Sequence, residues 1–501
     1  MANNRGTPIG MGKEEFRTVG HQLIDTIADF IETIQGRRVT TGESPKAIQG
    51  ILTRRSLPET GTSAAELLVR ATELLCNHSL LNGHPKFFGY ITSSAAPIGA
   101  LADLLAAAVN PNVGANILSP MATEIEKQTI RWLAEFVGLP LSYSGVLVSG
   151  GNMANFTAFR AAVAAKGSKQ IKEDGLSNVD AKLVVYCSQT THIWIEKAAV
   201  LFGIGLKSIR WIQTDSANRM DNHLLEKAIL QDVSEGYQPI MIVGTAGDVS
   251  TGIVDDLEGI AEICKTYDLW FHIDGAYGAP AAAIPELHEV FRGITSADSI
   301  ALDPHKWLYS PLEAGCTLIK DPKYLTDTYS SHPDYYNFDA HDDEQVLNYY
   351  EYGFQNSRGF RALKVWLALQ QAGRSGYIEM IAEDIRLSRL LYRLVAGHAE
   401  FEACSQNLSI ATFRYIPPDL QLSHEAREQY LNELNKALLD DLQSGGEVFL
   451  SNAVIREKYC LRACIVNFRT SEKDIEEVVE IISRRGKQVD LLLRNIVSKQ
   501  S

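Results

Sequence analysis

Residues 299–307 read Ser-Ile-Ala-Leu-Asp-Pro-His-Lys-Trp and place a lysine just after a short apolar run. Its first four residues form a short apolar run, which predicts a buried strand, and the Asp-Pro pair ends that strand. A lysine this close to a buried strand either extends its ammonium group into solvent or serves as a reactive amine. Partial burial favours the neutral amine, which can react with a carbonyl group to give an imine. We therefore take Lys306 as the first candidate catalytic residue.

The preceding apolar run, residues 270–273, ends in a similar way at Asp274-Gly275-Ala276. Burying a carboxylate is costly unless it has a strong partner. A positively charged heterocyclic nitrogen would be such a partner, and the small side chain of Ala276 leaves room for a ring. A role for Asp274 in a cap or turn is the alternative.

Two more polar clusters follow apolar runs earlier in the chain. Ser149-Gly150-Gly151-Asn152 precedes a helical pattern at residues 154–165. Glycines and the free N–H groups at the start of a helix form a cradle for phosphate, although most Gly-Gly turns are only turns. His192 follows the run 182–187 and offers a flat imidazole to an aromatic cofactor. A lone histidine in this position is more often structural.

The alternation of short apolar runs and longer helical patterns between residues 145 and 302 predicts βαβ units around a buried, mostly parallel sheet. Open α/β sheets bind their ligands at the carboxyl ends of the strands, which is where these clusters lie. Helical patterns at 359–372 and 377–394 come next. Mixed strand and helix patterns from 409 to 484 then predict a compact α+β unit, with Thr470 or Ser471 capping its last helix.

The beginning of the chain is predicted to form a separate helical arm. Residues 13–35 have apolar side chains at helical spacing, which gives one wide apolar face that must pack on something. A connector at 36–63 separates this helix from a second one at 64–75. We predict three domains, which are a dimerisation arm at 1–95, a large domain at 96–375 and a small α+β domain at 376–501.

Length and composition exclude several classes of protein. The 501 residues, of which 45% are hydrophobic, suffice for a large core and a satellite domain. A net charge of −14 argues against a basic surface for nucleic acid or anionic lipid. The apolar stretch 97–109 contains Asp103, is too short to cross a bilayer and predicts a buried helix. Residues 1–16 lack the apolar core of a signal peptide. Seven scattered cysteines without metal-ligand spacing predict no metal site and a cytoplasmic enzyme.

The order Gly-Gly-Asn at 150–152, His192, Asp274-Gly-Ala and Asp303-Pro-His-Lys-Trp resembles the group II decarboxylases that depend on pyridoxal 5′-phosphate (PLP). That family includes aromatic-amino-acid, histidine, tyrosine and glutamate decarboxylases. The resemblance extends over nearly the whole chain, including residues 84–88, 110–113 and 358–361. It implies an α/β protein of the PLP-dependent transferase fold (fold type I) that forms a homodimer.

The resemblance also implies roles for individual residues. PLP should form a Schiff base with Lys306, Asp274 should keep the pyridine nitrogen protonated, and His192 should stack on the ring. Gly151 and Asn152 should bind the phosphate. The other cofactor contacts that the resemblance implies are Thr245, Ala246, Ala276 and His305.

In this family a loop tyrosine closes over the site and protonates the substrate α-carbon after carbon dioxide leaves. The polar stretch 325–332, continuing to 343, predicts a mobile loop. Tyr329 aligns best with the family tyrosine, and Tyr335 and Tyr336 are the alternatives.

The implied reaction converts an L-amino acid to its amine and carbon dioxide. We expect an aromatic substrate, because Phe88 and Tyr90 offer a flat apolar wall and no basic residue is assigned to a side-chain carboxylate. Ile193-Trp194 departs from the small hydroxyl residues of many relatives, which leaves the substrate pocket less defined than the cofactor site. Ile91 and Leu312 stand where aromatic relatives have Phe, and Ser357 where some plant relatives separate phenolic from indolic substrates. The expected substrate contacts are Phe88, Tyr90, Thr92, Leu312 and Ser357.

Three alternatives remain open from the sequence. The first is a decarboxylase for an acidic, glutamate-type substrate. The second is a PLP aminotransferase or an aldehyde-forming oxidative deaminase, which would use the same lysine and aspartate. The third is a binding protein without catalytic activity on the same fold, although the intact Lys306, Asp274 and His192 argue against it.

Overall fold

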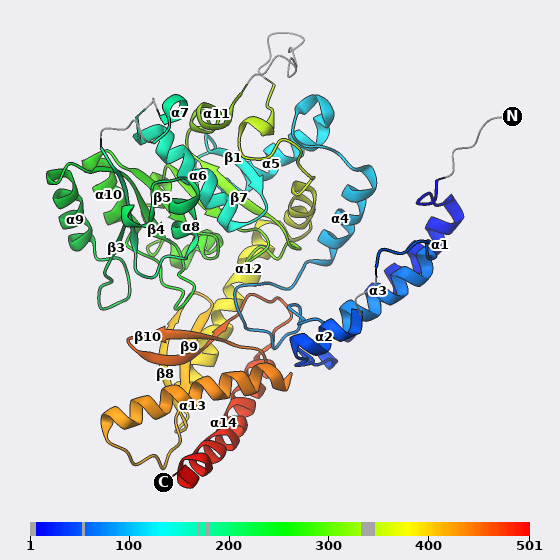
Figure 1. Cartoon of the computed structure of the whole chain (residues 1–501), viewed down its shortest axis with the longest axis vertical. Coiled ribbons are helices and arrows are strands. Elements are labelled where there is room, and N and C mark those ends of the chain that lie inside the picture. The colour runs from blue at the N-terminus through cyan, green and yellow to red at the C-terminus, as the bar shows by residue number, and fades with distance from the viewer. Residues whose placement is uncertain (1–6, 53–55, 169–170, 177–180, 332–345, 501) are drawn as a thin grey trace.

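The structure, a computed structural model, describes residues 7–52, 56–168, 171–176, 181–331 and 346–500. Figure 1 shows a large α/β unit, a C-terminal α+β unit below it and a group of N-terminal helices that projects to one side.

The large unit is built on a seven-stranded sheet with the order β1-β7-β6-β5-β4-β2-β3. All neighbouring strands are parallel except β7, which runs antiparallel to both β1 and β6. This confirms the predicted mostly parallel sheet. The strands are β1 (Ser144–Val148), β2 (Leu183–Ser188), β3 (Ile209–Ile212), β4 (Gln238–Thr245), β5 (Trp270–Asp274), β6 (Ser299–Leu302) and β7 (Gly315–Ile319).

The sequence patterns did not predict β3 or β7. β3 is a short edge strand whose Trp211 is partly exposed, so its apolar contrast is weak. β7 follows an irregular segment and contains Gly, Cys and Thr, although all of its residues are buried.

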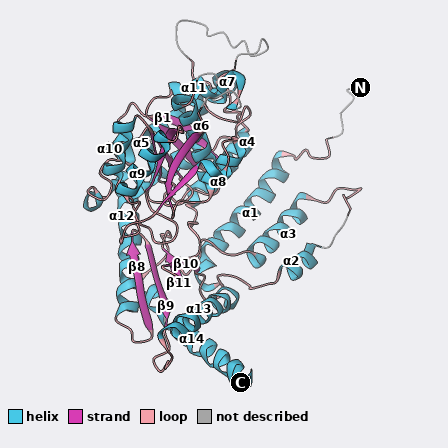
Figure 2. Ribbon diagram, turned by 60° about the vertical axis from the view of Figure 1, so that its left-hand side comes forward, coloured by secondary structure: helices cyan, strands magenta, loops and turns pink. Residues whose placement is uncertain are grey.

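Helices cover the sheet on both faces, as a buried parallel sheet requires (Figures 1 and 2). The central one, α6, packs against β4, β5, β6 and β7, so that its first turn lies beside the ends of these strands. The helices of this unit are α5 (Pro120–Phe136), α6 (Gly151–Lys166), α7 (Ile171–Asp174), α8 (Trp194–Leu201), α9 (Asn222–Ser234), α10 (Leu257–Tyr267) and α11 (Lys323–Tyr329).

The C-terminal unit is the predicted compact α+β structure. Its antiparallel sheet has the order β10-β11-β9-β8. Ser471 caps the last helix, because its hydroxyl accepts a hydrogen bond from the Asp474 N–H at 3.3 Å. The elements are β8 (Phe401–Asn407), β9 (Ile410–Tyr415), β10 (Ser451–Ile455), β11 (Lys458–Cys464), α13 (His424–Gly445) and α14 (Glu472–Gln500).

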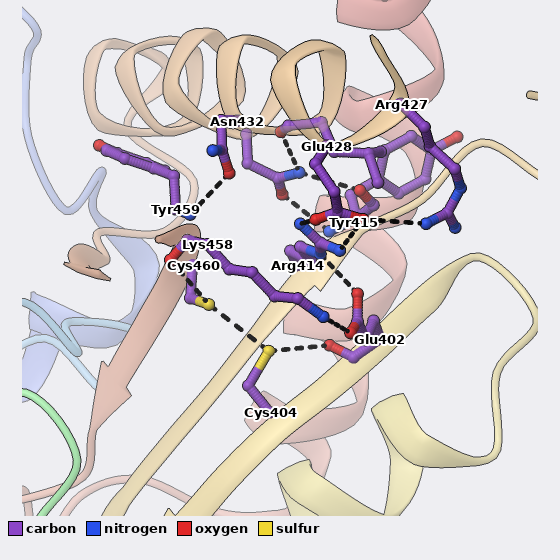
Figure 3. A network of polar contacts seen from close by, with 12 residues as sticks. Glu402, Cys404, Arg414, Tyr415, Arg427, Glu428, Asn432, Lys458, Tyr459 and Cys460 are labelled. Carbon is purple, nitrogen blue, oxygen red and sulfur yellow. Dashed lines mark hydrogen bonds and ion pairs between the residues drawn. The ribbon is translucent and has the colours of Figure 1, made fainter. Parts of the chain in front are cut away.

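A partly buried charge network lies on this small sheet (Figure 3). The Arg414 side chain on β9 has no exposed area and pairs with Glu402 at 2.5 Å and Glu428 at 2.8 Å. Lys458 also contacts Glu402, at 2.6 Å. Polar, half-buried residues such as Glu402 explain why the sequence pattern did not reveal β8.

Helix α12 (Ala362–Ala396) joins the two units. The sequence predicts two helices here, and the structure has a break at Gly373, whose φ of 67° favours glycine.

The sequence places the end of the arm at residue 95, but the chain already packs on the C-terminal unit before that residue. Phe88 N–H donates to the Phe449 carbonyl and Cys464 N–H donates to the Phe88 carbonyl, so this segment joins the small sheet.

The N-terminal arm contains α1 (Lys13–Thr33), α2 (Pro45–Leu52) and α3 (Ala64–His78), and Figure 2 shows α1 and α3 side by side. The predicted helices are confirmed, whereas α2 lies within the predicted connector. Within α1, Val19 is buried, whereas the larger apolar side chain of Phe16 is 58% exposed. The apolar face of the arm is therefore largely uncovered in the single chain.

Helix α4 (Pro97–Val109) corrects one expectation, because the sequence predicts that it is buried. One face packs on α12, while Leu101, Leu105 and Val109 on another face are each at least half exposed. Among the described helices, none is both long enough and apolar enough to span a bilayer.

Candidate functional site

A cavity of about 880 Å³ lies at the carboxyl ends of the parallel strands. The structure brings the four sequence clusters together around it. The residues from these clusters that line it are Ser149, Gly150, Gly151, Asn152, His192, Asp274, Ala276, Asp303, His305 and Lys306.

Lys306 extends into this cavity from the turn that follows β6. Its Nζ lies 3.1 Å from Asp303 Oδ2, and the Asp303 side chain is only 2% exposed. Asp303 Oδ1 is also buried and has no hydrogen-bond partner among the described residues. The cavity therefore holds an amine next to a buried carboxylate that can accept one more donor. The sequence pattern identifies Asp303 only as the end of a strand. Its position three residues before Lys306 is a hint of the ion pair between them.

Asp274 ends β5 and reaches the same cavity. Its Oδ2 accepts a hydrogen bond from Trp194 Nε1 at 2.8 Å, and its Oδ1 accepts one from the Ala276 N–H at 3.3 Å. Trp194 has no exposed area and does not line the cavity. This corrects the interpretation of Trp194 as a change in the substrate pocket, because its indole supports Asp274 instead.

His192 lines the cavity from the turn before α8. The N–H of Trp194 donates to His192 Nδ1 at 3.3 Å, which leaves the proton of a neutral ring on Nε2. Burial lowers the pKa of the His192 imidazole, against the opposing effect of the Asp274 carboxylate. His192 is therefore neutral near pH 7 and presents an uncharged aromatic face.

The turn before α6 has the backbone geometry of an anion cradle. Gly150 has a φ of 154°, and a Cβ on Gly151 would lie 2.7 Å from Asp303 Oδ2. Both positions therefore require glycine. The first turn of α6 has no side-chain cap, so its N–H groups remain available to an anion. Asn152 and Ser149 line the cavity beside this turn.

The remaining predicted cofactor contacts divide into two groups. Thr245, Ala276 and His305 line the cavity. Burial lowers the pKa of the His305 imidazole, whose Nδ1 lies 2.6 Å from the Ala314 carbonyl oxygen. Ala246 does not line the cavity, because it is fully buried and its backbone bonds to Asp274 and Gly278.

The predicted substrate contacts are only partly brought to the cavity. Tyr90, Thr92 and Leu312 line it, together with Ile91. Phe88 is a correction, since its ring is fully buried among the apolar residues of the small unit. Ser357 is exposed and does not line the cavity of this chain.

Arg462 is a cavity residue that the sequence did not reveal. It projects from β11, is 4% exposed and lines the cavity. Its Nη2 donates to the Tyr90 carbonyl at 2.9 Å, its Nη1 donates to the Val249 carbonyl, and its Nε has no partner among the described residues. The available signal was an arginine within the apolar run of β11, because an arginine side chain is rarely buried unless it has a partner.

Tyr329 lies at the end of α11, which corrects the predicted loop at its position. Its hydroxyl donates to the Thr157 carbonyl at 3.1 Å, and its ring packs edge-on against Phe354 at 4.9 Å. It does not line the cavity of this chain. Tyr335 and Tyr336 lie outside the described residues.

The groups in the cavity fit PLP. An amine can bind its aldehyde, a carboxylate can pair with its pyridine nitrogen, and a flat neutral imidazole can cover its ring. The uncapped helix start with its two glycines suits the phosphate. The partnerless Asp303 Oδ1 can accept a further donor beside Lys306.

Comparisons with known proteins agree with this chemistry. Residues 47–416 match the model of the pyridoxal-dependent decarboxylase conserved domain. The chain is 33% identical to an aromatic-L-amino-acid decarboxylase of Bacillus atrophaeus over 482 residues, which cover 96% of this chain and 97% of that protein. It is 30% identical to a phenylacetaldehyde synthase of a Rosa hybrid cultivar over 488 residues, which cover 95% and 94% of the two chains.

A solved structure gives the same result for the fold. The crystal structure of Oryza sativa TDC with PLP and tryptamine superposes with a TM-score of 0.89 at 25% identity, over 97% of this chain and 99% of the other. This similarity agrees with fold type I, which the mostly parallel sheet and the small antiparallel sheet also indicate. The chain therefore belongs to the pyridoxal-dependent decarboxylase family, whose cofactor is PLP.

Proposed function

We propose that this enzyme decarboxylates an aromatic L-amino acid to its amine and carbon dioxide, with PLP bound covalently to Lys306. The observation that carries the proposal is the position of Lys306, Asp274 and His192 around one cavity with the glycine turn of α6. Among these groups are the amine, the acid, the aromatic face and the anion cradle that the cofactor requires.

Each group would hold one part of the cofactor. Lys306 Nζ would bond to the aldehyde carbon, and the N–H groups at Gly151 and Asn152 would bind the phosphate. Asp274 would pair with the pyridine nitrogen, while His192 would cover one face of the ring and Ala276 would leave space on the other. When bound, PLP supplies an electron-accepting ring for the electron pair left by the departing carboxylate.

The residues of this chain control where protons are held. Asp274 accepts hydrogen bonds from Trp194 and Ala276, which fix the direction of its side chain, and it would hold a proton at the pyridine nitrogen. Asp303 orients the Lys306 amine from 3.1 Å. A neutral His192 covers the ring without adding a second cation beside the pyridinium.

An aromatic substrate is supported by the cavity wall and by the relatives. Tyr90, Ile91 and Leu312 give the cavity a largely apolar side, on which a flat ring can pack. Arg462 reaches the cavity, but two of its nitrogens already donate to backbone carbonyls. Because the aromatic-L-amino-acid decarboxylase of Bacillus atrophaeus matches over almost the full length, we place the substrate in the same class.

Aldehyde formation is the second candidate, and one relative favours it. The Rosa protein, at 30% identity over 95% of this chain, is a phenylacetaldehyde synthase. The amine route needs a proton donor at the substrate α-carbon, for which we retain Tyr329 as the first candidate. Without that donor, molecular oxygen would accept two electrons and leave as hydrogen peroxide, and water would release the product as aldehyde and ammonia.

We further propose a homodimer in which the arm of each chain packs on its partner. The apolar faces of α1 and α4 are uncovered in the single chain, with Phe16 58%, Leu105 53% and Val109 67% exposed. Apolar patches of this kind mark protein interfaces, and a twofold arrangement is the usual solution for identical chains. All seven cysteines are free thiols, which fits the cytoplasmic location that we infer.

Product analysis tests the proposed function directly. Pure protein with PLP should release carbon dioxide and amine in equal amounts from one or more of tyrosine, phenylalanine, tryptophan and DOPA, and little from glutamate. Aldehyde with ammonia would favour the second candidate, and a keto acid would indicate an aminotransferase. Turnover of glutamate alone would contradict the aromatic assignment.

A further inference from the structure

Trp194 combines two contacts that no other described residue makes together. Its indole N–H donates to Asp274 Oδ2 at 2.8 Å, while its backbone N–H donates to His192 Nδ1 at 3.3 Å. Because Trp194 begins α8, one residue at the start of a helix orients both the acid and the imidazole of the proposed cofactor site. The indole itself lies outside the cavity and cannot touch a bound molecule there.

The packing around Trp194 fixes the direction of its indole. The side chain is fully buried, with Phe159 edge-on at 6.4 Å and His272 edge-on at 5.8 Å. His272 is itself held from both sides, because Nε2 lies 2.7 Å from Asn155 Oδ1 and Nδ1 lies 2.8 Å from Ser299 Oγ. The indole therefore has little freedom to turn away from Asp274.

Asp274 receives no charged hydrogen-bond donor in the described part of the chain. Its two donors are the Trp194 indole at 2.8 Å and the Ala276 amide at the longer distance of 3.3 Å. A hydrogen bond to a buried carboxylate is stronger than a bond between neutral groups, since the anion has lost its water. The shorter bond, from Trp194, therefore contributes most to stabilising the anionic form of Asp274.

We infer that Trp194 is a positioning residue that keeps the proton on the pyridine nitrogen of PLP by weakening Asp274 as a base. This inference rests on the proposed function, in which Asp274 faces that nitrogen. A proton shared between a carboxylate and a pyridine lies closer to the stronger base. An indole N–H on the carboxylate stabilises the anion and thereby leaves the proton with the nitrogen. The ring then stays cationic, which is the form that accepts electrons best.

The test compares two tryptophan variants that lose the same atoms. Trp194→Phe keeps an aromatic ring in the core, removes the N–H donor to Asp274 and makes the side chain smaller. Trp270→Phe is the matched control, because Trp270 is also buried and its indole donates at 2.8 Å to the neutral Ser299 hydroxyl. Each holoenzyme is reconstituted with PLP that carries ¹⁵N at the pyridine nitrogen.

We expect the ¹⁵N resonance of Trp194→Phe to move toward that of unprotonated pyridine, while Trp270→Phe keeps the wild-type resonance. PLP should still bind to Trp194→Phe, because the indole does not line the cavity. The fall in kcat should exceed the change in KM. A wild-type resonance in Trp194→Phe would overturn the inference, because a purely structural tryptophan would not alter nitrogen protonation.

A second substitution covers the case in which Trp194→Phe does not fold. 3-Benzothienylalanine at position 194 has the shape of tryptophan with sulfur in place of the N–H group, so its packing is preserved. It should give the same displaced resonance, and an unchanged resonance would again overturn the inference. If the wild-type protein binds no PLP, the proposed function itself fails, and this result is distinct from a bound cofactor with unchanged nitrogen.

Discussion

Asp384 Oδ2 accepts a hydrogen bond from Trp307 Nε1 at 2.9 Å, which ties the residue after Lys306 to helix α12. The same oxygen accepts a hydrogen bond from the Tyr309 hydroxyl at 2.6 Å. Tyr377, also on α12, donates to the Leu308 carbonyl at 3.1 Å. The turn that carries Lys306 is therefore held by α12, the helix that joins the two units. The position of the lysine depends on how the two units pack.

The Asp384 contact predicts a particular dependence of stability on pH. Burial raises the pKa of Asp384 from 3.8 to about 7. Between these values the folded protein binds a proton that the unfolded chain has lost, so the contribution of this group is fully present below about pH 4 and is lost as the pH rises through 7. Asp384→Asn cannot ionise, so its melting temperature relative to wild type should rise between pH 5 and pH 8. A constant difference would contradict the assignment.

Tyr329→Phe tests the proton donor. The variant keeps the ring against Phe354 and loses the hydroxyl, so we expect normal PLP binding, loss of amine formation and partial diversion to aldehyde and ammonia. Tyr324→Phe on the same helix is the control and should keep the amine as product. Amine formation at the wild-type rate by Tyr329→Phe would transfer the role to Tyr335 or Tyr336. Chromatography of amine and aldehyde products gives the measurement.

Charge on α4 should disrupt the proposed dimer. Leu101 and Leu105 are 50% and 53% exposed on one face, so replacing both with Asp would place carboxylates in the interface and yield monomers. Leu230→Asp on α9 is the control, because Leu230 is similarly exposed at 54% on another part of the surface. Light scattering should give the mass of two chains for wild type and control. A wild-type monomer with full activity would refute the dimer.

The ion pair between Arg358 and Glu126 predicts a large effect on stability. The two side chains are 2% and 0% exposed and lie 2.5 Å apart. Arg358→Met leaves Glu126 buried without its partner, which should destabilise the protein by about 3–5 kcal/mol. The double variant with Glu126→Gln should recover part of this loss. Arg292→Met breaks an exposed pair with Glu258 and should change the urea midpoint little.

The sequence allowed the fold class and the centre of the site to be predicted for a physical reason. Parallel strands bury both faces, so their apolar runs are plain, and their carboxyl ends meet at one edge of the sheet. Lys306, Asp274 and His192 could therefore be placed near one another from the sequence alone. Gly151 was also predictable, because only glycine allows the backbone to approach a second group so closely.

The features that were missed depend on contacts between distant parts of the chain. Trp194 is a large aromatic residue at a helix start, and nothing local shows that its N–H meets Asp274, 80 residues further along. Phe88 has the composition of a substrate wall, but its segment joins the small sheet through Phe449 and Cys464. Arg462 reaches the cavity from the small unit, whose position relative to the large one is not encoded in any local pattern.

Borohydride reduction of the holoenzyme, followed by peptide mass spectrometry, shows whether Lys306 carries the cofactor. Wild-type protein with PLP should show visible cofactor absorbance that reduction abolishes, and the label should be on Lys306. Lys306→Ala should remain folded, lack that absorbance and carry no label at this position. Wild-type protein that binds PLP and is reduced without a label on Lys306 would rule out Lys306 as the residue that holds the cofactor.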